Sequence, residues 1–444
     1  MKMRRHILVM IIAAVSLCFP ARVNAEPLGK RILLDNGMVL LLAEKHDLPT
    51  VTVSVTIKAG KTAEPENNPG LASLTASLLM QGTSIRSANQ ISEEIDFIGG
   101  SLSTSCGDDF ATASMRVLKK DLRTGLDLLS DILANPVFDQ KEIDRQVKIT
   151  LADIKRRNGE PGIVAKEAFD KTVFGRNPYG MTSEDVANYL PRLTREQILS
   201  FYSTRYMPNN SIISVVGDVT EKEIMVLLNS SFKVWRKTDQ SIPIAVPPPA
   251  AIRKAVLKIN RDITQANIAM GNLGMSRENP DYYAAMVMNY ILGSGGFSSR
   301  LVDNIRDNKG LAYDVHSVLS AQKEPGAFTI IIQTKNESAN EVIEDTLKEI
   351  HRIQSELVSE KELADAKAYL TGSFPLRMDT YAKIAVMLTA IEIYNLGLDY
   401  PQKYQLLTGA VTREDVLRVA QTYLHPGKII IVVVANLKKA KLKF

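Results

Sequence analysis

The histidines of this chain are too few and too scattered for a metal centre. A histidine-based catalytic zinc site needs at least two imidazoles that converge on the ion. No two histidines here stand at the spacing of a metal-ligand pair. The residues alone therefore predict no self-contained catalytic zinc site. The five histidines are His6, His46, His316, His351 and His425.

Serine and cysteine nucleophiles lack the neighbours that would activate them. The chain has no G-x-S-x-G segment, and no Ser-His-Asp set stands out. Cys106 lies in LSTSCGDDF, which is typical of a strand end and turn, with no histidine within thirty residues. His316 alternates with apolar residues in LAYDVHSVLS, a pattern typical of a strand. We therefore expect Cys106 to be an ordinary packed or half-exposed thiol.

The segment Asn67–Thr83, NNPGLASLTASLLMQGT, has the features of a short helix. Its asparagines can cap the start, its proline suits the first turn, and its last glycine can end it. The leucines recur at helical spacing and predict a packed face. Ser73 and Ser77 are four residues apart and share another face, with Ala76 beside them. Two hydroxyls and a methyl group stand where a metallopeptidase helix would carry imidazoles and a carboxylate.

The segment 294–315, SGGFSSRLVDNIRDNKGLAYDV, is a second candidate site. Gly293, Gly295 and Gly296 predict a flexible loop, and a helix and a returning strand follow it. The loop lacks the spacing and the lysine of a phosphate-binding P-loop. A phosphate site is therefore not expected here.

Arg306 and Tyr313 lie on either side of the predicted helix-to-strand reversal, which can bring both side chains to one surface. Arginine can bind a peptide carbonyl or carboxylate, and tyrosine can donate to a developing oxyanion. The alternative is structural: Arg306 complements the dipole at the helix end and Tyr313 packs. Spacing alone leaves both interpretations open.

The first 25 residues have the composition of a signal peptide. A basic start, an apolar stretch and a small-residue site after Ala25 follow one another. We expect a periplasmic or secreted protein without a stable membrane span after processing. The alternative is an uncleaved membrane anchor. The leader holds four basic residues and no acid, so the net charge of +5 falls to +1 after cleavage, and no nucleic-acid partner is expected.

The remaining chain repeats itself. The segment VTREDVLRVAQTYLHPGKIIIVVVANL, from Val411, matches LTREQILSFYSTRYMPNNSIISVVGDV, from Leu193, at a constant offset of 218 residues. Each copy mixes hairpins with helices, which predicts two homologous α+β domains with largely antiparallel sheets. With 444 residues, 45% of them hydrophobic, the chain can bury two sizeable cores. The predicted ranges are 1–25 for the signal peptide, 26–235 and 256–444 for the domains, and 236–255 for a proline-rich linker.

These segments resemble those of the pitrilysin (insulinase-like) metallopeptidase family. GLASLTASLLMQGT is similar to the family's helix G-L-A-H-x-x-E-H-x-L-x-x-G-T, and SGGFSSRLVDNIRDNKGLAY to its segment G-G-x-x-S-R-L-x-x-x-x-R-x-x-x-G-L-A-Y. The resemblance covers essentially the whole mature chain. It implies two repeat domains that form half of a clam-shell chamber.

The resemblance also implies that the zinc-site positions are degenerate. Ser73 and Ser77 stand where the family has its zinc histidines, and Ala76 replaces the general-base glutamate. The third ligand, a glutamate in the family, falls on Asp153. A lone aspartate cannot hold catalytic zinc, and without the glutamate no water would be activated.

In heterodimeric members of that family, one subunit carries the zinc helix and the other supplies an Arg/Tyr pair. By this resemblance, Arg306 and Tyr313 would bind peptide substrate and stabilise the tetrahedral intermediate at the zinc of an H-x-x-E-H partner subunit. Zinc is then expected in the partner and no cofactor in this chain. Two alternatives stay open: a non-catalytic peptide-binding or assembly protein of the same fold, and a standalone enzyme with other chemistry.

Overall fold

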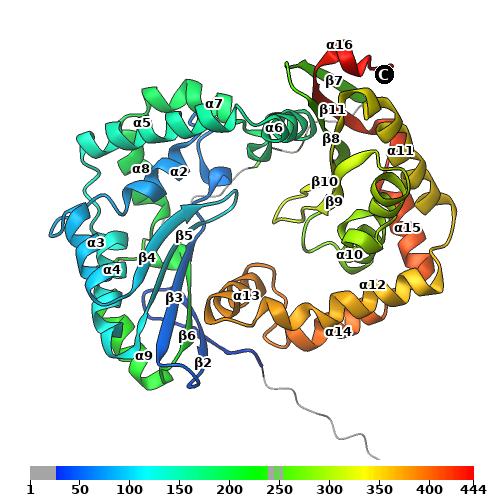
Figure 1. The fold of residues 1–444 in the computed structure, drawn as a ribbon. Coiled ribbons are helices and arrows are strands. Elements are labelled where there is room, and N and C mark those ends of the chain that lie inside the picture. Colours follow the sequence, from blue (N-terminus) through cyan, green and yellow to red (C-terminus); the bar gives the residue numbers. More distant parts are fainter. Residues whose placement is uncertain (1–26, 239–245, 248, 250–253) are drawn as a thin grey trace, which may run out of the picture.

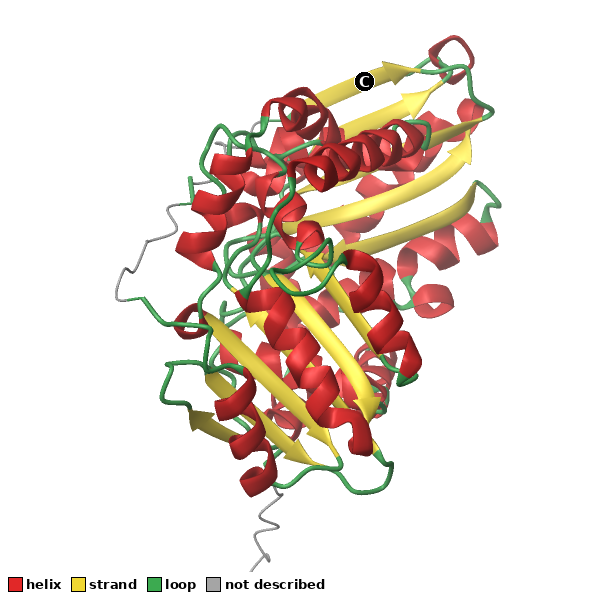
Figure 2. Ribbon diagram, turned by 90° about the vertical axis from the view of Figure 1, so that its left-hand side faces the viewer, coloured by secondary structure: helices red, strands yellow, loops and turns green. Residues whose placement is uncertain are grey.

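The computed structural model describes residues 27–238, 246–247, 249 and 254–444 (Figure 1). The predicted signal peptide and most of the predicted linker lie outside these residues, and the domain limits stay a prediction. The described chain forms two β-sheets packed with helices, which confirms the α+β class. Figure 2 shows the strands of both sheets with helices against their faces.

The first sheet has six strands in the order β1-β2-β6-β3-β5-β4. β2 and β6 run parallel, and the other neighbours are antiparallel. The central strands β3 and β6 are almost wholly buried because helices cover both faces of the sheet there. The edge strand β4 alternates between exposed and half-buried residues. The strands are β1 (Lys30–Leu33), β2 (Val39–Glu44), β3 (Thr50–Ile57), β4 (Ser101–Cys106), β5 (Ala111–Leu118) and β6 (Ser211–Gly217).

The second sheet repeats the topology of the first. Its order is β7-β11-β8-β10-β9, which matches β2-β6-β3-β5-β4 strand for strand. Its one parallel pair, β7 with β11, corresponds to β2 with β6. The shared order confirms the internal repeat. The strands are β7 (Ala255–Asn260), β8 (Gln265–Leu273), β9 (Ala312–Leu319), β10 (Ala327–Lys335) and β11 (Ile430–Ala435).

Helices bury one face of each sheet in a large apolar core. In the described ranges, none of them combines the length and the apolar character that a membrane span requires. The first half contains α2 (Leu71–Leu78), α3 (Ala88–Phe97), α4 (Leu122–Ala134), α5 (Gln140–Arg157), α6 (Pro161–Phe174), α7 (Ser183–Tyr189), α8 (Arg195–Arg205) and α9 (Glu221–Ser231). The second contains α10 (Tyr282–Asn289), α11 (Ala339–Ser355), α12 (Glu360–Gly372), α13 (Tyr381–Ile393), α14 (Tyr400–Gly409), α15 (Arg413–Tyr423) and α16 (Leu437–Ala440).

Two helices cross to the sheet of the other half. Helix α6 packs on β8 and β11, where Phe169 and Val432 share a buried cluster (Figure 1). Helix α13 packs on β6 and β3, where Leu388 and Val216 share another. Each half thus covers the second face of the other half's sheet. This reciprocal exchange interlocks the halves, and the repeat pattern alone did not predict it.

Candidate functional site

Three of the four degenerate zinc-site positions meet in one pocket. Ser73 and Ser77 on α2 and Asp153 on α5 line a pocket of about 270 Å³ between the two helices. Ala76 points elsewhere: it is only 1% exposed and belongs to the core of the first half. The structure therefore brings together the two serines and the aspartate.

The groups in this pocket do not fit a zinc ion. The Ser77 hydroxyl donates to the Leu74 carbonyl oxygen at 2.9 Å. The Asp153 carboxylate accepts a hydrogen bond of 2.8 Å from Arg156, one turn along its own helix. Zinc sites are built from imidazole, thiolate and carboxylate ligands in numbers of three or four. Among the described residues, no group of three or more such side chains is placed to hold a metal ion.

The start of α2 is held by a residue that sequence reasoning missed. The Glu64 carboxylate accepts hydrogen bonds from the backbone N–H groups of Ala72, at 2.8 Å, and of Gly70, at 3.3 Å. The expected asparagine cap is wrong, because the helix begins only at Leu71 and Gly70 precedes it with φ +91°. Burial raises the pKa of Glu64 to about 8. Glu64 precedes these N–H groups by six and eight residues, which is not the spacing of a capping box, so no standard cap motif marks it.

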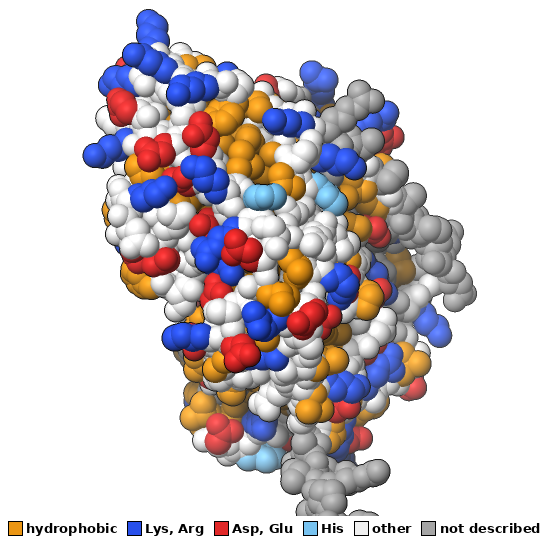
Figure 3. All heavy atoms as spheres, turned by 90° about the vertical axis from the view of Figure 1, so that its right-hand side faces the viewer, with side chains coloured by type: hydrophobic (Ala, Val, Ile, Leu, Met, Phe, Trp, Pro, Cys, Tyr) orange, Lys and Arg blue, Asp and Glu red, His pale blue; other side chains and the backbone are white. Residues whose placement is uncertain are grey.

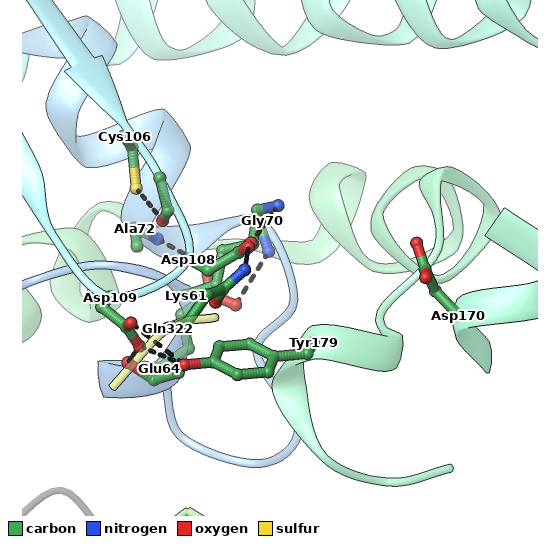
Figure 4. Close-up of polar contacts among 12 residues, drawn as sticks. Lys61, Glu64, Gly70, Ala72, Cys106, Asp108, Asp109, Asp170, Tyr179 and Gln322 are labelled. Atoms are coloured by element: carbon green, nitrogen blue, oxygen red, sulfur yellow. Dashed lines mark hydrogen bonds and ion pairs between the residues drawn. The ribbon is translucent and has the colours of Figure 1, made fainter. Parts of the chain in front are cut away.

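Lys61 and Cys106 lie beside the same end of α2 (Figure 4). The Lys61 ammonium pairs with Asp108 at 2.9 Å. Burial opposes the charge of Lys61, but the Asp108 carboxylate outweighs it and raises the lysine pKa above its usual value. Lys61 is therefore a fixed cation and not a general base for Ser73. Burial raises the pKa of Cys106 to about 12, which agrees with the expected unreactive thiol.

The Arg306 and Tyr313 side chains are both exposed in the second half. Tyr313, near the start of β9, is 74% exposed, so the alternative that it packs in a core is wrong. The guanidinium of Arg306 lies 5.2 Å from the ring centroid of Phe297, itself 73% exposed. Phe297 is a neighbour that sequence reasoning did not single out, although it lies within the glycine-rich segment. A cation over an aromatic face is attracted by the ring quadrupole.

The helix that carries Arg306 is a π-helix, whereas the sequence predicted an ordinary helix. The segments η6 (Tyr290–Ser294) and η8 (Val302–Asn308), on either side of the glycine-rich loop, are π-helical. Such wide turns are rare and are found frequently at functional sites. Both segments lie against β9.

The expected flexible loop is largely helical, because Gly293 belongs to η6 and Gly296 begins a short 3-10 turn, and its three glycines are constrained for different reasons. At Gly293 an added Cβ would lie 2.5 Å from the Ser317 hydroxyl oxygen, so only glycine allows η6 to approach β9 this closely. Gly296 has open space around it but a φ of +57°, which favours glycine. Gly295 lies between them, where a Cβ would approach the Tyr290 carbonyl oxygen to 2.7 Å.

The structure does not bring the two candidate sets together. Ser73 and Ser77 lie on α2 in the first half, whereas Tyr313 lies on β9 in the second (Figure 1). A complete catalytic constellation is therefore not assembled by the described part of this chain.

Comparison with known proteins identifies the family from both halves. The family described as insulinase (peptidase family M16) matches residues 39–185, and the peptidase M16 inactive domain matches residues 192–370. A protein of Rickettsia felis described as an uncharacterised zinc protease is 28% identical over 350 residues, which cover 79% of this chain and 84% of that protein. A probable mitochondrial-processing peptidase subunit beta of Arabidopsis thaliana is 26% identical, with 90% and 76% covered.

Solved structures agree with this assignment. A peptidase M16 inactive domain protein from Pseudomonas fluorescens superposes with a TM-score of 0.85 at 26% identity, covering 92% of this chain and 98% of its own. A protease from Helicobacter pylori has the same fold, with a TM-score of 0.86 at 20% identity, and the coverages are 92% and 100%. With serines and an aspartate at the metal positions, this chain belongs to the M16 (pitrilysin, insulinase-like) peptidase family as a member that lacks the zinc motif.

Proposed function

We propose that this chain is the non-catalytic, substrate-binding subunit of a heterodimeric zinc endopeptidase. The observation that carries the proposal is the contrast between its two halves. The pocket of the first half lacks the three or four ligands of a zinc site among the described residues, whereas the Arg306 and Tyr313 side chains of the second half are exposed. A relative from Arabidopsis thaliana is itself named as a subunit of a peptidase.

In this proposal the partner subunit carries H-x-x-E-H, holds the zinc and activates the water. Arg306 would bind a carbonyl of the substrate backbone, and the Tyr313 hydroxyl would donate to the oxygen of the scissile carbonyl, where the partner's zinc would supply Lewis-acid chemistry. A donor aimed at a developing oxyanion stabilises the transition state more than the ground state. The leader predicted for residues 1–25 supports assembly in the periplasm.

Coexpression with an H-x-x-E-H subunit from the same genome tests the proposal. We expect peptide cleavage and one zinc per heterodimer, and neither cleavage nor bound zinc in this chain alone. Arg306→Ala and Tyr313→Phe should each lower kcat/KM by about 100-fold, the usual effect of losing one oxyanion donor. Peptide cleavage and zinc content by elemental analysis are the measurements.

Arg352→Ala is the matched control, because Arg352 is an exposed arginine on α11. It should leave kcat/KM unchanged. Full activity of the Arg306 and Tyr313 variants would contradict the roles proposed for these two residues. A stable heterodimer without any cleavage would instead indicate a peptide-holding or assembly protein.

A further inference from the structure

The pocket at the degenerate zinc positions is lined by two cations. Lys61 and Arg157 line it together with the hydroxyl side chains of Ser73, Ser77 and Thr150. Two carboxylates, Asp153 and Glu167, line it as well, so the formal charges of the pocket balance. A metal-cation site instead has an excess of anionic ligands, so the present groups suit another kind of ligand.

The two carboxylates in the pocket wall are already engaged. Asp153 is bonded to Arg156 at 2.8 Å, which directs it along the surface of α5. Glu167 accepts hydrogen bonds from both the backbone N–H and the hydroxyl of Ser183. Neither acid therefore neutralises the pocket cations through a close hydrogen bond.

Both cations have N–H donors that are not used in hydrogen bonds within the described residues. In the part of the chain that the structure describes, the nearest carboxylate oxygen to the Arg157 guanidinium belongs to Glu167, at 3.9 Å, and no hydrogen bond joins them. Lys61 uses one of its three N–H donors on Asp108, which lies outside the pocket lining. An arginine fork with free donors matches the geometry of a carboxylate.

The rest of the wall is largely apolar, with Gly70, Thr182 and Ser183 beside five aliphatic or thioether side chains. The volume of about 270 Å³ suits a single amino-acid residue better than a long segment. A ligand that combines a carboxylate with an apolar side chain would satisfy both parts of the surface. The five residues are Leu74, Ile154, Met181, Val186 and Leu190.

We propose that this pocket binds the C-terminal carboxylate of a peptide, with an apolar last residue against the aliphatic wall. Arg157 and Lys61 hold the carboxylate, and the hydroxyls of Ser73 and Thr150 complete the polar side. This proposal depends on the proposed function in one respect, which is that the subunit encounters peptide substrates. It gives the pocket at the degenerate zinc positions a role in this chain, which is to anchor one end of the substrate.

Binding to the isolated chain tests the proposal without any partner. The probes are two fluorescent hexapeptides that end in leucine, one with a free C-terminal carboxylate and one with a C-terminal amide. Fluorescence anisotropy should show at least tenfold tighter binding of the free acid. Arg157→Gln should lower the affinity for the acid to that of the amide and leave the affinity for the amide unchanged.

Lys155→Gln is the matched control, because Lys155 is an exposed cation on the same helix that does not line the pocket. It should leave the tenfold preference intact, and thermal melts of all variants should coincide. Equal affinity for acid and amide, absence of peptide binding, or an equal loss in Lys155→Gln would overturn the proposal. Cleavage by the heterodimer does not enter the measurement, so failure of the proposed function would be seen separately.

Discussion

The Glu64 carboxyl both fixes the start of α2 and makes the stability of the fold depend on pH. Its oxygens accept the N–H groups of Gly70 and Ala72, which would otherwise be unsatisfied at the start of α2. The carboxyl is half-buried in the wall of a pocket, and the loss of surrounding water raises its pKa from 4.5 to about 8. At neutral pH the protonated form is therefore favoured in the folded protein.

This shift predicts a pH-dependent stability. The folded chain binds the Glu64 proton more tightly than the unfolded chain, so the stabilisation is complete below about pH 4.5 and is lost as the pH rises through about 8. One pKa unit corresponds to about 1.4 kcal/mol, so we expect Glu64→Gln to gain several kcal/mol relative to the wild type between pH 5 and 9. Urea unfolding at several pH values measures this difference.

Glu66→Gln is the control for that experiment, since Glu66 is an exposed carboxylate two residues away. The unfolding free energy of Glu66→Gln should equal that of the wild type at every pH. Parallel curves for wild type and Glu64→Gln would show that Glu64 does not titrate with folding.

At the scale of the element, the exchanged helices explain why the central strands are so apolar. β11 is IIVVVA and wholly buried, because α15 and its neighbours cover one face and α6 covers the other. β6 is buried in the same way, with α13 on its second face. A hydrogen bond of 2.9 Å between the hydroxyls of Ser214 and Thr389 crosses that junction.

Truncating a side chain of an exchanged helix should therefore weaken the other half. Leu388 is fully buried against the first sheet, and Leu388→Ala should cost about 2–5 kcal/mol of unfolding free energy. Val386 lies on the same helix but is 67% exposed, so Val386→Ala should change stability by less than about 0.5 kcal/mol. Hydrogen exchange should become faster in β6 as well as in α13 of Leu388→Ala. Faster exchange confined to α13 would contradict the interlocked arrangement.

The approach of η6 to β9 gives a second prediction at this scale. In Gly293→Ala the new Cβ would collide with Ser317, so β9 and Tyr313 should be displaced. We expect a loss of about 1–3 kcal/mol, as for other overpacked sites, together with reduced activity of the heterodimer. Gly372→Ala is the control, because nothing lies within 4 Å of its added Cβ. Thermal melts and peptide cleavage compare the two variants, and similar behaviour would argue against a special role for Gly293.

At the scale of the whole molecule, polar bonds join the two halves besides the exchanged helices. Arg31 binds both carboxylate oxygens of Glu392 at 2.8 Å. Gln322, in the β9–β10 turn, donates to Asp108 in the β4–β5 turn. Figure 3 shows acidic and basic side chains interspersed on the face of the second half, as on an ordinary solvated surface.

This interlocking predicts a single unfolding transition. Trp235, the only tryptophan, is buried in the core of the first half and reports on that half alone. Far-ultraviolet circular dichroism reports on both halves. The two signals should give the same midpoint in urea, because neither sheet keeps both faces covered without the other half. Separate midpoints would show that the halves unfold independently.

Much of the fold was predictable because its signals are local. The two matching segments at an offset of 218 residues predicted the repeat that the two sheets confirm. The residue types at positions 73, 76 and 77 predicted the loss of the zinc motif directly, since ligand chemistry is a property of the side chain itself. The π-helical winding of η6 and η8 was not predictable, because the spacing of apolar residues over one turn does not separate it from an α-helix.

The sequence by itself determined that this chain lacks the zinc motif, and it predicted Arg306 and Tyr313 as the residue pair for function. Only the tertiary structure decided that α6 and α13 exchange sheets, that Glu64 holds α2 and that Tyr313 faces solvent. It also decided that Arg157 and Lys61 share one pocket with Ser73, Ser77 and Asp153. The physical reason is that these contacts and exposures depend on how the chain packs in three dimensions, to which neither periodicity nor standard local motifs respond.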